Sequence, residues 1–207
     1  MSTYLAFLIA ATALAVTPGP GVAFVVARTV AGGRAEGLAA SLGTGLGGLQ
    51  HVLAAAFGLS VLLAQSAVAF SIIKYLGAAY LIYLGVRLVL TKEGRQAPAA
   101  VGGAHGVWRG LRDGIFVEAL NVKTAIFFVA FLPQFVVLEQ PLAPQLMLLG
   151  VVCVGLNTLA DIGYVFATER LLGSPALRAG RERMLTRVSG GTMIGLGLYL
   201  AAARREV

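Results

Sequence analysis

The sequence predicts an all-α membrane protein with six transmembrane helices, arranged as two inverted three-helix repeats in which helices 1 and 4 are broken. Apolar residues make up 58% of the 207 residues and charged residues only 12%, too little polar surface to cover a water-soluble domain of this length. The apolar residues fall into runs long enough to cross a bilayer. Prolines and polar residues interrupt the first and the fourth run at corresponding depths.

Six runs of mostly apolar residues predict the spanning helices. They are Tyr4–Ala27, Leu38–Leu63, Val68–Leu90, Leu111–Val137, Leu146–Thr168 and Val188–Ala203. The last run is short, so a protein with five spans is the alternative. The first run contains no Lys or Arg and continues past its prolines, which favours a membrane helix over a cleaved signal peptide. Nearly every residue then belongs to a helix or a link, so residues 1–207 form a single integral membrane domain.

The segment 91–108 is the only long stretch of polar and small residues, and it divides the chain into two halves of three spans each. Repeat 1 covers about 1–90 and repeat 2 about 109–207. Because three is an odd number, the second repeat enters the membrane in the opposite sense to the first. Inverted repeats of this kind are a common plan of transporters, whose substrate sites lie near the midplane between the repeats.

The formal net charge of +7 follows the predicted topology. Lys and Arg gather around the links between spans one and two, three and four, and five and six, whereas the links around 64–68 and 138–145 contain none. Positive residues favour cytoplasmic loops, so these three links should face the cytoplasm and both termini the outside. Arg204 and Arg205 disagree with this orientation, which leaves an inward C-terminus as an alternative. The basic charge therefore indicates topology and no nucleic-acid partner.

The prolines of Pro18-Gly19-Pro20 interrupt the first run. They lack N–H groups, so two carbonyls of the preceding turn lose their helical donors, and each proline biases the residue before it away from helix. We therefore expect two half-helices, one ending in free carbonyls and the other starting with free N–H groups at Gly21. Such a junction can bind a cation and an anion, and an amino acid carries one of each. A proline kink that only shapes packing is the alternative.

The fourth run contains Glu118, Asn121 and Lys123 at the corresponding depth. Asn121 can cap a restarting half-helix by accepting a hydrogen bond from the N–H of Lys123 or Thr124. A charge such as Lys123 inside the membrane costs at least ~2.5–3.5 kcal/mol, so it is a functional-site candidate. A structural ion pair with Glu118 or Asp161 is the alternative. Two broken spans in matching positions indicate a transporter site.

Two further polar side chains are candidates for proton coupling. Asp161 lies inside span five, where its carboxyl group can carry a proton or serve as a fixed counter-ion to Lys123. His51 lies near the middle of span two, where it can hydrogen-bond a neighbouring helix or relay a proton. Neither has a second metal ligand at helical spacing and no nucleophile–base pair is evident, so the sequence predicts no metal, no cofactor and no enzyme.

Together these motifs resemble the LysE/RhtB family of amino-acid exporters over nearly the whole chain. The resemblance rests on Pro18-Gly19-Pro20, "GGRAEGLAASLGTGLG" (32–47), "KYLGAAYLIYLGVRL" (74–88), the Asn121/Lys123 segment and "FFVAFLPQF" (127–135). It implies a multi-pass protein of the bacterial inner membrane that exports amino acids or their derivatives using the proton gradient. It also implies that Pro18, Gly19, Pro20, Asn121 and Lys123 lie on the substrate path, and it matches Asp161 to an acidic position of the fifth span.

The chain departs from this family at two positions. Gly21 stands where the family usually has Asn, and Val122 replaces the proline of its Asn-Pro-Lys motif. Because Val122 keeps its N–H, we expect the fourth span to be less broken than the first. Gly21 removes an amide that could touch the substrate, and Glu118 adds a carboxylate one turn from Asn121 that could compensate.

The sequence thus predicts a secondary active exporter of amino acids or amino-acid derivatives, driven by the proton-motive force and working by alternating access. Its predicted substrate site comprises Pro18, Gly19, Pro20, Gly21, Glu118, Asn121 and Lys123, and its predicted proton-coupling residues are Asp161, Glu118 and His51. We expect Lys123 to meet the substrate carboxylate. The alternatives are a non-transporting scaffold subunit or an exporter of another small metabolite.

The expected partners are a small-molecule substrate, the lipid bilayer and a second copy of the chain. Gly43/Gly47 and Gly191/Gly195 are spaced four apart, which lets helix backbones approach closely, either within the chain or in a homodimer.

Overall fold

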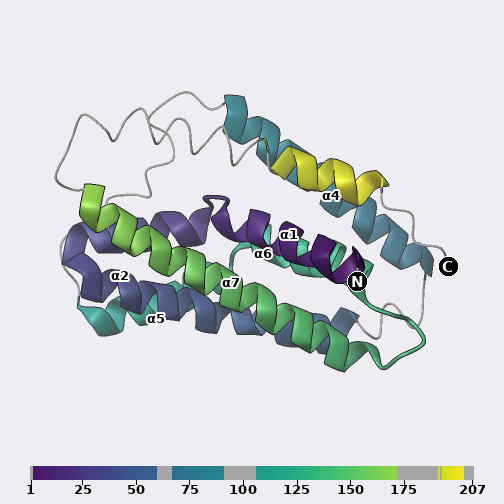
Figure 1. Cartoon of the computed structure of the whole chain (residues 1–207), viewed down its shortest axis with the longest axis horizontal. Coiled ribbons are helices and arrows are strands. Elements are labelled where there is room, and N and C mark those ends of the chain that lie inside the picture. The colour runs from purple at the N-terminus through teal and green to yellow at the C-terminus, as the bar shows by residue number, and fades with distance from the viewer. Residues whose placement is uncertain (1, 60–66, 91–105, 172–190, 192, 203–207) are drawn as a thin grey trace.

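The structure is a computed structural model that describes residues 2–59, 67–90, 106–171, 191 and 193–202. All the secondary structure of these residues is helical, without a strand, which confirms the all-α prediction (Figure 1). The helices are α1 (Ser2–Val16), α2 (Pro20–Ala54), α4 (Ala67–Leu90), α5 (Val107–Ala119), α6 (Val122–Ile126), α7 (Leu142–Leu171) and Met193–Ala202. The π-helical segments Ala55–Leu59 and Phe127–Phe131 and the 3₁₀ helix Leu132–Phe135 complete them.

Length and apolarity identify up to three spans in the described part of the chain. Leu142–Arg170 is long and apolar enough to cross a membrane by itself. Two bent helix pairs qualify when each is counted as one span: Tyr4–Val16 with Pro20–Gly58, bent by 44°, and Val107–Ala119 with Val122–Phe135, bent by 45°. The six-span inverted repeat therefore remains a prediction. Most of the 91–108 linker and parts of the predicted second and sixth spans lie outside the described residues.

The link predicted between the first two spans is shorter in the structure than the sequence suggested. The predicted spans leave 28–37 as a connection, but α2 is helical on both sides of a single non-helical residue, Gly33. Its φ of 74° lies in the left-handed region that glycine adopts readily. The chain turns back there, which brings Arg28 beside Glu36 and Gly21 opposite Thr44 (Figure 1).

The fourth span is broken as sharply as the first, so the expectation of a weaker break was wrong. Asn121 has an extended backbone (φ −75°, ψ 100°), and its side-chain oxygen accepts a hydrogen bond from the N–H of Lys123 at 3.1 Å. The backbone N–H of Asn121 donates in turn to the carbonyl of Glu118 at 3.0 Å. An asparagine N-cap thus starts a new helix at Val122 without a proline, as the capping prediction required.

Glycines bring the second half of α2 against α5. A Cβ atom added at Gly43 would collide with the carbonyl oxygen of Leu111, and one at Gly47 would lie 2.5 Å from the carbonyl oxygen of Ile115. On the facing helix, a Cβ at Gly114 would lie 2.7 Å from the carbonyl oxygen of Ala40. The predicted packing role of Gly43/Gly47 is therefore confirmed within the chain. A homodimer stays a prediction.

Gly43→Ala is expected to destabilise the protein by about 1–3 kcal/mol, because the added methyl group meets backbone that cannot move aside cheaply. Gly155→Ala on α7 is the matched control, since a Cβ there meets nothing within 4 Å. Thermal unfolding of both purified variants in detergent measures the difference. Equal melting temperatures would show that α2 and α5 do not pack as closely as described.

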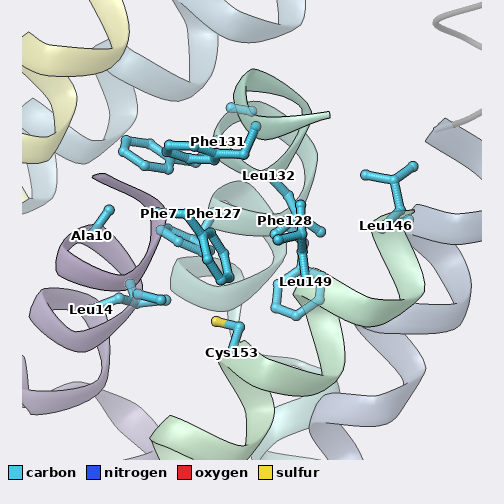
Figure 2. Close-up of a cluster of buried hydrophobic side chains, with 14 of the residues drawn as sticks. Phe7, Ala10, Leu14, Phe127, Phe128, Phe131, Leu132, Leu146, Leu149 and Cys153 are labelled. Carbon is cyan, nitrogen blue, oxygen red and sulfur yellow. The ribbon is translucent and has the colours of Figure 1, made fainter. Parts of the chain in front are cut away.

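A cluster of aromatic rings fixes the direction of the helix that restarts after Asn121. Phe127 and Phe131 stack with centroids 4.9 Å apart (Figure 2). Phe7 of α1 meets Phe135 edge to face at 5.4 Å. Cys153 of α7 lies fully buried as a free thiol in the same cluster, where it packs as a small apolar side chain. The cluster joins α1, α7 and the segment that follows α6.

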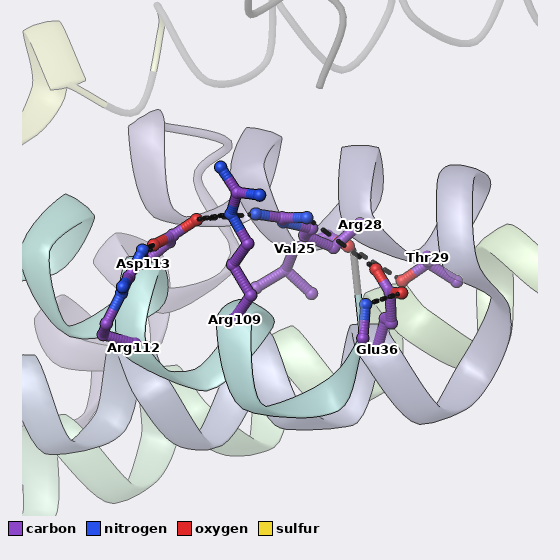
Figure 3. A network of polar contacts seen from close by, with 8 residues as sticks. Val25, Arg28, Thr29, Glu36, Arg109, Arg112 and Asp113 are labelled. Carbon is purple, nitrogen blue, oxygen red and sulfur yellow. Dashed lines mark hydrogen bonds and ion pairs between the residues drawn. The ribbon is translucent and has the colours of Figure 1, made fainter. Parts of the chain in front are cut away.

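A second buried assembly is a network of charges near the Gly33 turn (Figure 3). The Arg28 guanidinium, only 2% exposed, lies 2.7 Å from a carboxylate oxygen of Asp113 and 3.8 Å from one of Glu36. Glu36 also accepts a hydrogen bond from the backbone N–H of Gly106 at 2.6 Å. Three segments, from both sides of the turn and from α5, are thereby tied together. The Arg28–Asp113–Glu36 network places Arg28 and Glu36, which the sequence assigns to a link, in buried contacts between helices.

Candidate functional site

The carbonyls freed by the first break are bonded by side chains from the second half of the chain. Lys123 Nζ donates to the carbonyl oxygen of Thr17 at 2.9 Å and approaches that of Leu14 at 3.4 Å. The hydroxyl of Tyr164 on α7 donates to the carbonyl of Val16 at 2.8 Å. Tyr164 thus replaces the donor that Pro20 cannot provide to Val16. The carbonyl of Leu14, which would bond to residue 18, accepts the backbone N–H of Thr17 at 3.2 Å in addition to Lys123.

The second break is organised around Glu118. One carboxylate oxygen accepts a hydrogen bond from the Asn121 amide at 2.9 Å, and the other accepts one from the Thr124 hydroxyl at 2.6 Å. These bonds connect the end of α5 to the start of α6 across the break. Glu118, which the sequence places one turn from Asn121, thus contacts it directly.

His51 contacts this break from α2. Its Nε2 lies 2.8 Å from the carbonyl oxygen of Glu118, and because a carbonyl only accepts, Nε2 must carry the hydrogen. The predicted hydrogen bond to a neighbouring helix is therefore present, while a proton relay stays a prediction. Each break is held by side chains from the other half of the chain: Lys123 and Tyr164 at the first, His51 at the second.

A cavity of about 20 Å³ lies between the two breaks. Its polar lining residues are Thr44, Glu118, Asn121, Lys123, Thr124, Asn157, Thr158 and Asp161, and Gly21 is among the small or apolar ones. Of the other predicted site residues, Pro18, Gly19, Pro20 and His51 do not line it. This volume holds about one water molecule.

Three buried ionisable groups surround the cavity without pairing. Glu118, Lys123 and Asp161 are 7%, 8% and 6% exposed. Within the described residues, Lys123 forms no ion pair with either carboxylate, so the alternative of a structural pair is not supported. Asp161 instead accepts a hydrogen bond from the hydroxyl of Thr44 at 2.8 Å. With all three groups ionised, the site carries a formal charge of −1.

Gly21 makes room for the carboxylate of Glu118. A Cβ atom at this position would lie 2.7 Å from Glu118 Oε2, closer than two such atoms can approach. The absence of a side chain at Gly21 on α2 therefore leaves the space that the Glu118 carboxylate on α5 occupies. Whether Glu118 takes over the substrate contact that Gly21 lacks stays a prediction.

Sequence reasoning missed three residues that hold the site together: Thr44, Thr124 and Tyr164. Thr44 and Asp161 are 117 positions apart, and Tyr164 and Val16 are 148 apart. No local pattern reports such contacts. Thr124 adjoins the Asn121/Lys123 motif, and a hydroxyl next to a predicted helix restart was the one available signal.

The family model of the LysE type translocator matches residues 12–204 of the chain. A homoserine/homoserine lactone efflux protein of Salmonella typhi is 31% identical over 210 residues, covering 97% of each chain. A leucine efflux protein of Klebsiella pneumoniae is 29% identical over 206 residues, covering 97% of this chain and 93% of its own. An uncharacterized membrane protein of Vibrio cholerae is 30% identical, covering 97% of both. No solved structure matches the chain. With the family model extending over nearly its whole length, the chain belongs to the LysE type translocator family.

Proposed function

We propose that the protein is a secondary active exporter of amino acids or amino-acid derivatives in the bacterial inner membrane. The family membership and the efflux activities named for its relatives support an exporter. The observation that carries the proposal is the cavity between two broken helices, where a half-helix N-terminus and three buried charges meet. Sites of this construction at breaks in spanning helices are typical of transporters.

An amino acid fits the charges around this cavity. Its ammonium group can bind the carboxylates of Glu118 and Asp161, whose described hydrogen bonds come from neutral amides and hydroxyls. Its carboxylate can bind the N-terminal end of α2 at Gly21, where the first N–H groups of a helix lack acceptors within that helix. Asn121 and Lys123 also line the cavity.

The charge balance supports coupling to protons. A formal charge of −1 can be neutralised either by a proton on Glu118 or Asp161 or by the ammonium group of a substrate. Because both ligands compete for the same carboxylates, one can be exchanged for the other, and proton entry can drive substrate exit. His51 contacts the Glu118 backbone and is a candidate for proton delivery.

The small volume of the cavity supports alternating access. Even the smallest amino acid is larger than the single water molecule that the cavity can hold, so the helices must separate to admit it. The contacts of Lys123 with Thr17 and of His51 with Glu118 join the two halves of the chain and are expected to change as the halves move. The protein would move its substrate without altering it chemically and without a cofactor.

Ligand-dependent stability of the purified protein in detergent tests the proposal. A transported amino acid at 100 times its Kd should stabilise the protein by about 2.7 kcal/mol, visible as a higher melting temperature. The same ligand should not stabilise Asp161→Asn, in which one of the two carboxylates is neutral. The panel includes leucine, homoserine and homoserine lactone, beside a broad set of amino acids. If no member raises the melting temperature, the substrate belongs to another class of metabolite or the protein is a scaffold.

A further inference from the structure

The ammonium group of Lys123 binds backbone carbonyl oxygens and not a carboxylate. Its Nζ contacts the carbonyl oxygens of Thr17 and Leu14, at 2.9 and 3.4 Å, and forms no ion pair with Glu118 or Asp161. The side chain is 8% exposed, so water contributes little to its solvation. The backbone of the first break therefore replaces the hydration shell of this ammonium group.

The end of a helix is a favourable place for a cation. The carbonyl of Leu14 accepts one hydrogen bond from the N–H of Thr17 at 3.2 Å and keeps a second lone pair for another donor. The aligned peptide dipoles place about −0.5 elementary charge at this end of α1. Unwound carbonyls and half-helix C-termini coordinate small cations at breaks of this kind. An ammonium group is a compact cation with three donors, and it can occupy such a position in place of a free ion.

Gly19 leaves space for the same ammonium group. A Cβ atom at residue 19 would lie 2.9 Å from Lys123 Nζ and 3.0 Å from Cε. The backbone of Gly19 is extended (φ −143°, ψ −168°), a conformation that any residue adopts. The absence of a side chain is therefore explained by the space that the lysine occupies and not by backbone strain.

We infer that the carbonyls of Leu14 and Thr17 form a site for a small monovalent cation, and that Lys123 is a tethered cation that fills it. In this role Lys123 is a positioning residue: its fixed charge joins the two breaks and makes a free inorganic cation at this position unnecessary. Removing the lysine side chain exposes a site that a free ammonium-type cation can enter. The inference concerns the empty protein and is independent of which substrate is transported.

The test is chemical rescue of Lys123→Ala by methylammonium, with melting temperature in detergent as the readout. Lys123→Ala should melt at a lower temperature than the wild type, and saturating methylammonium should raise it by at least about 2–4 °C. Choline at equal concentration controls for ionic strength, because its quaternary nitrogen has no N–H to donate to the carbonyls. Lys74→Ala is the matched control, since Lys74 is also buried but lies on α4 over the ring of Tyr75. If methylammonium acts no more strongly on Lys123→Ala than on Lys74→Ala, or no better than choline, the inference is overturned.

Gly19→Ala provides a second test that keeps the lysine and so does not depend on the folding of Lys123→Ala. The methyl group should displace Nζ from the carbonyls and lower the melting temperature, whereas Gly155→Ala should not. In the Lys123→Ala background the Gly19→Ala change should cost much less, because the group it displaces is gone. A Gly19→Ala variant as stable as the wild type would contradict the proposed role. Because both tests measure stability without substrate, a failed exporter hypothesis and a failed cation site give different results.

Discussion

Glu118→Gln is expected to keep the fold and to lose most of the export activity. Glutamine can still accept a hydrogen bond from the Asn121 amide and donate one to the Thr124 hydroxyl, so the contacts across the second break survive. The negative charge that would bind the substrate ammonium or a proton is lost. A hydrogen bond to a charged group contributes about 1.5–3 kcal/mol, which corresponds to roughly a 10- to 150-fold loss of substrate affinity.

Initial efflux rates and the melting temperature of Glu118→Gln, measured on the same preparation, separate the two effects. Glu139→Gln is the control, because Glu139 lies exposed in the turn before α7. The Glu118→Gln variant should melt within a few degrees of the wild type while its efflux falls. Wild-type efflux with an unchanged response to the pH gradient would remove Glu118 from the substrate and coupling site.

Arg28→Met is expected to cost about 3–5 kcal/mol of stability, because it leaves the buried carboxylate of Glu36 without its cation. The double variant Arg28→Met/Glu36→Gln removes both charges and should recover much of the loss. Arg34→Met is the matched control on the same turn, since Arg34 is exposed and packs over the ring of Phe166. Thermal unfolding of the three variants in detergent provides the comparison. A single variant as stable as Arg34→Met would show that the Arg28–Asp113–Glu36 network does not hold the Gly33 turn.

The two breaks were predictable because their causes are local in the sequence. Prolines at positions 18 and 20 remove backbone donors, and Asn121 is a good N-cap, whatever surrounds them. The prediction of a weaker second break was wrong because it considered only that Val122 is not a proline. The asparagine cap alone starts the new helix, with a bend of 45° against 44° at the first break.

The partners of each break were not predictable, because tertiary packing decides them. The sequence suggested that Lys123 faces the substrate carboxylate, and the structure places its ammonium on carbonyls 106 and 109 positions earlier in the chain. It likewise gave no indication that Thr44 would bond Asp161. The two consecutive glycines, Gly32 and Gly33, were a local signal for the turn. The lengths of the apolar runs did not use this signal and assigned the ten residues 28–37 to a link.

The most direct test of the proposed function is efflux of radiolabelled amino acids from preloaded proteoliposomes, with and without an imposed pH gradient. The wild type is compared with Glu118→Gln, with the Pro18→Ala/Pro20→Ala double variant and with protein-free liposomes. The proposal predicts that one class of amino acid leaves the wild-type vesicles faster when the gradient is imposed, and that both variants lose this release. Release equal to that from protein-free liposomes for every amino acid, with or without the gradient, would contradict it.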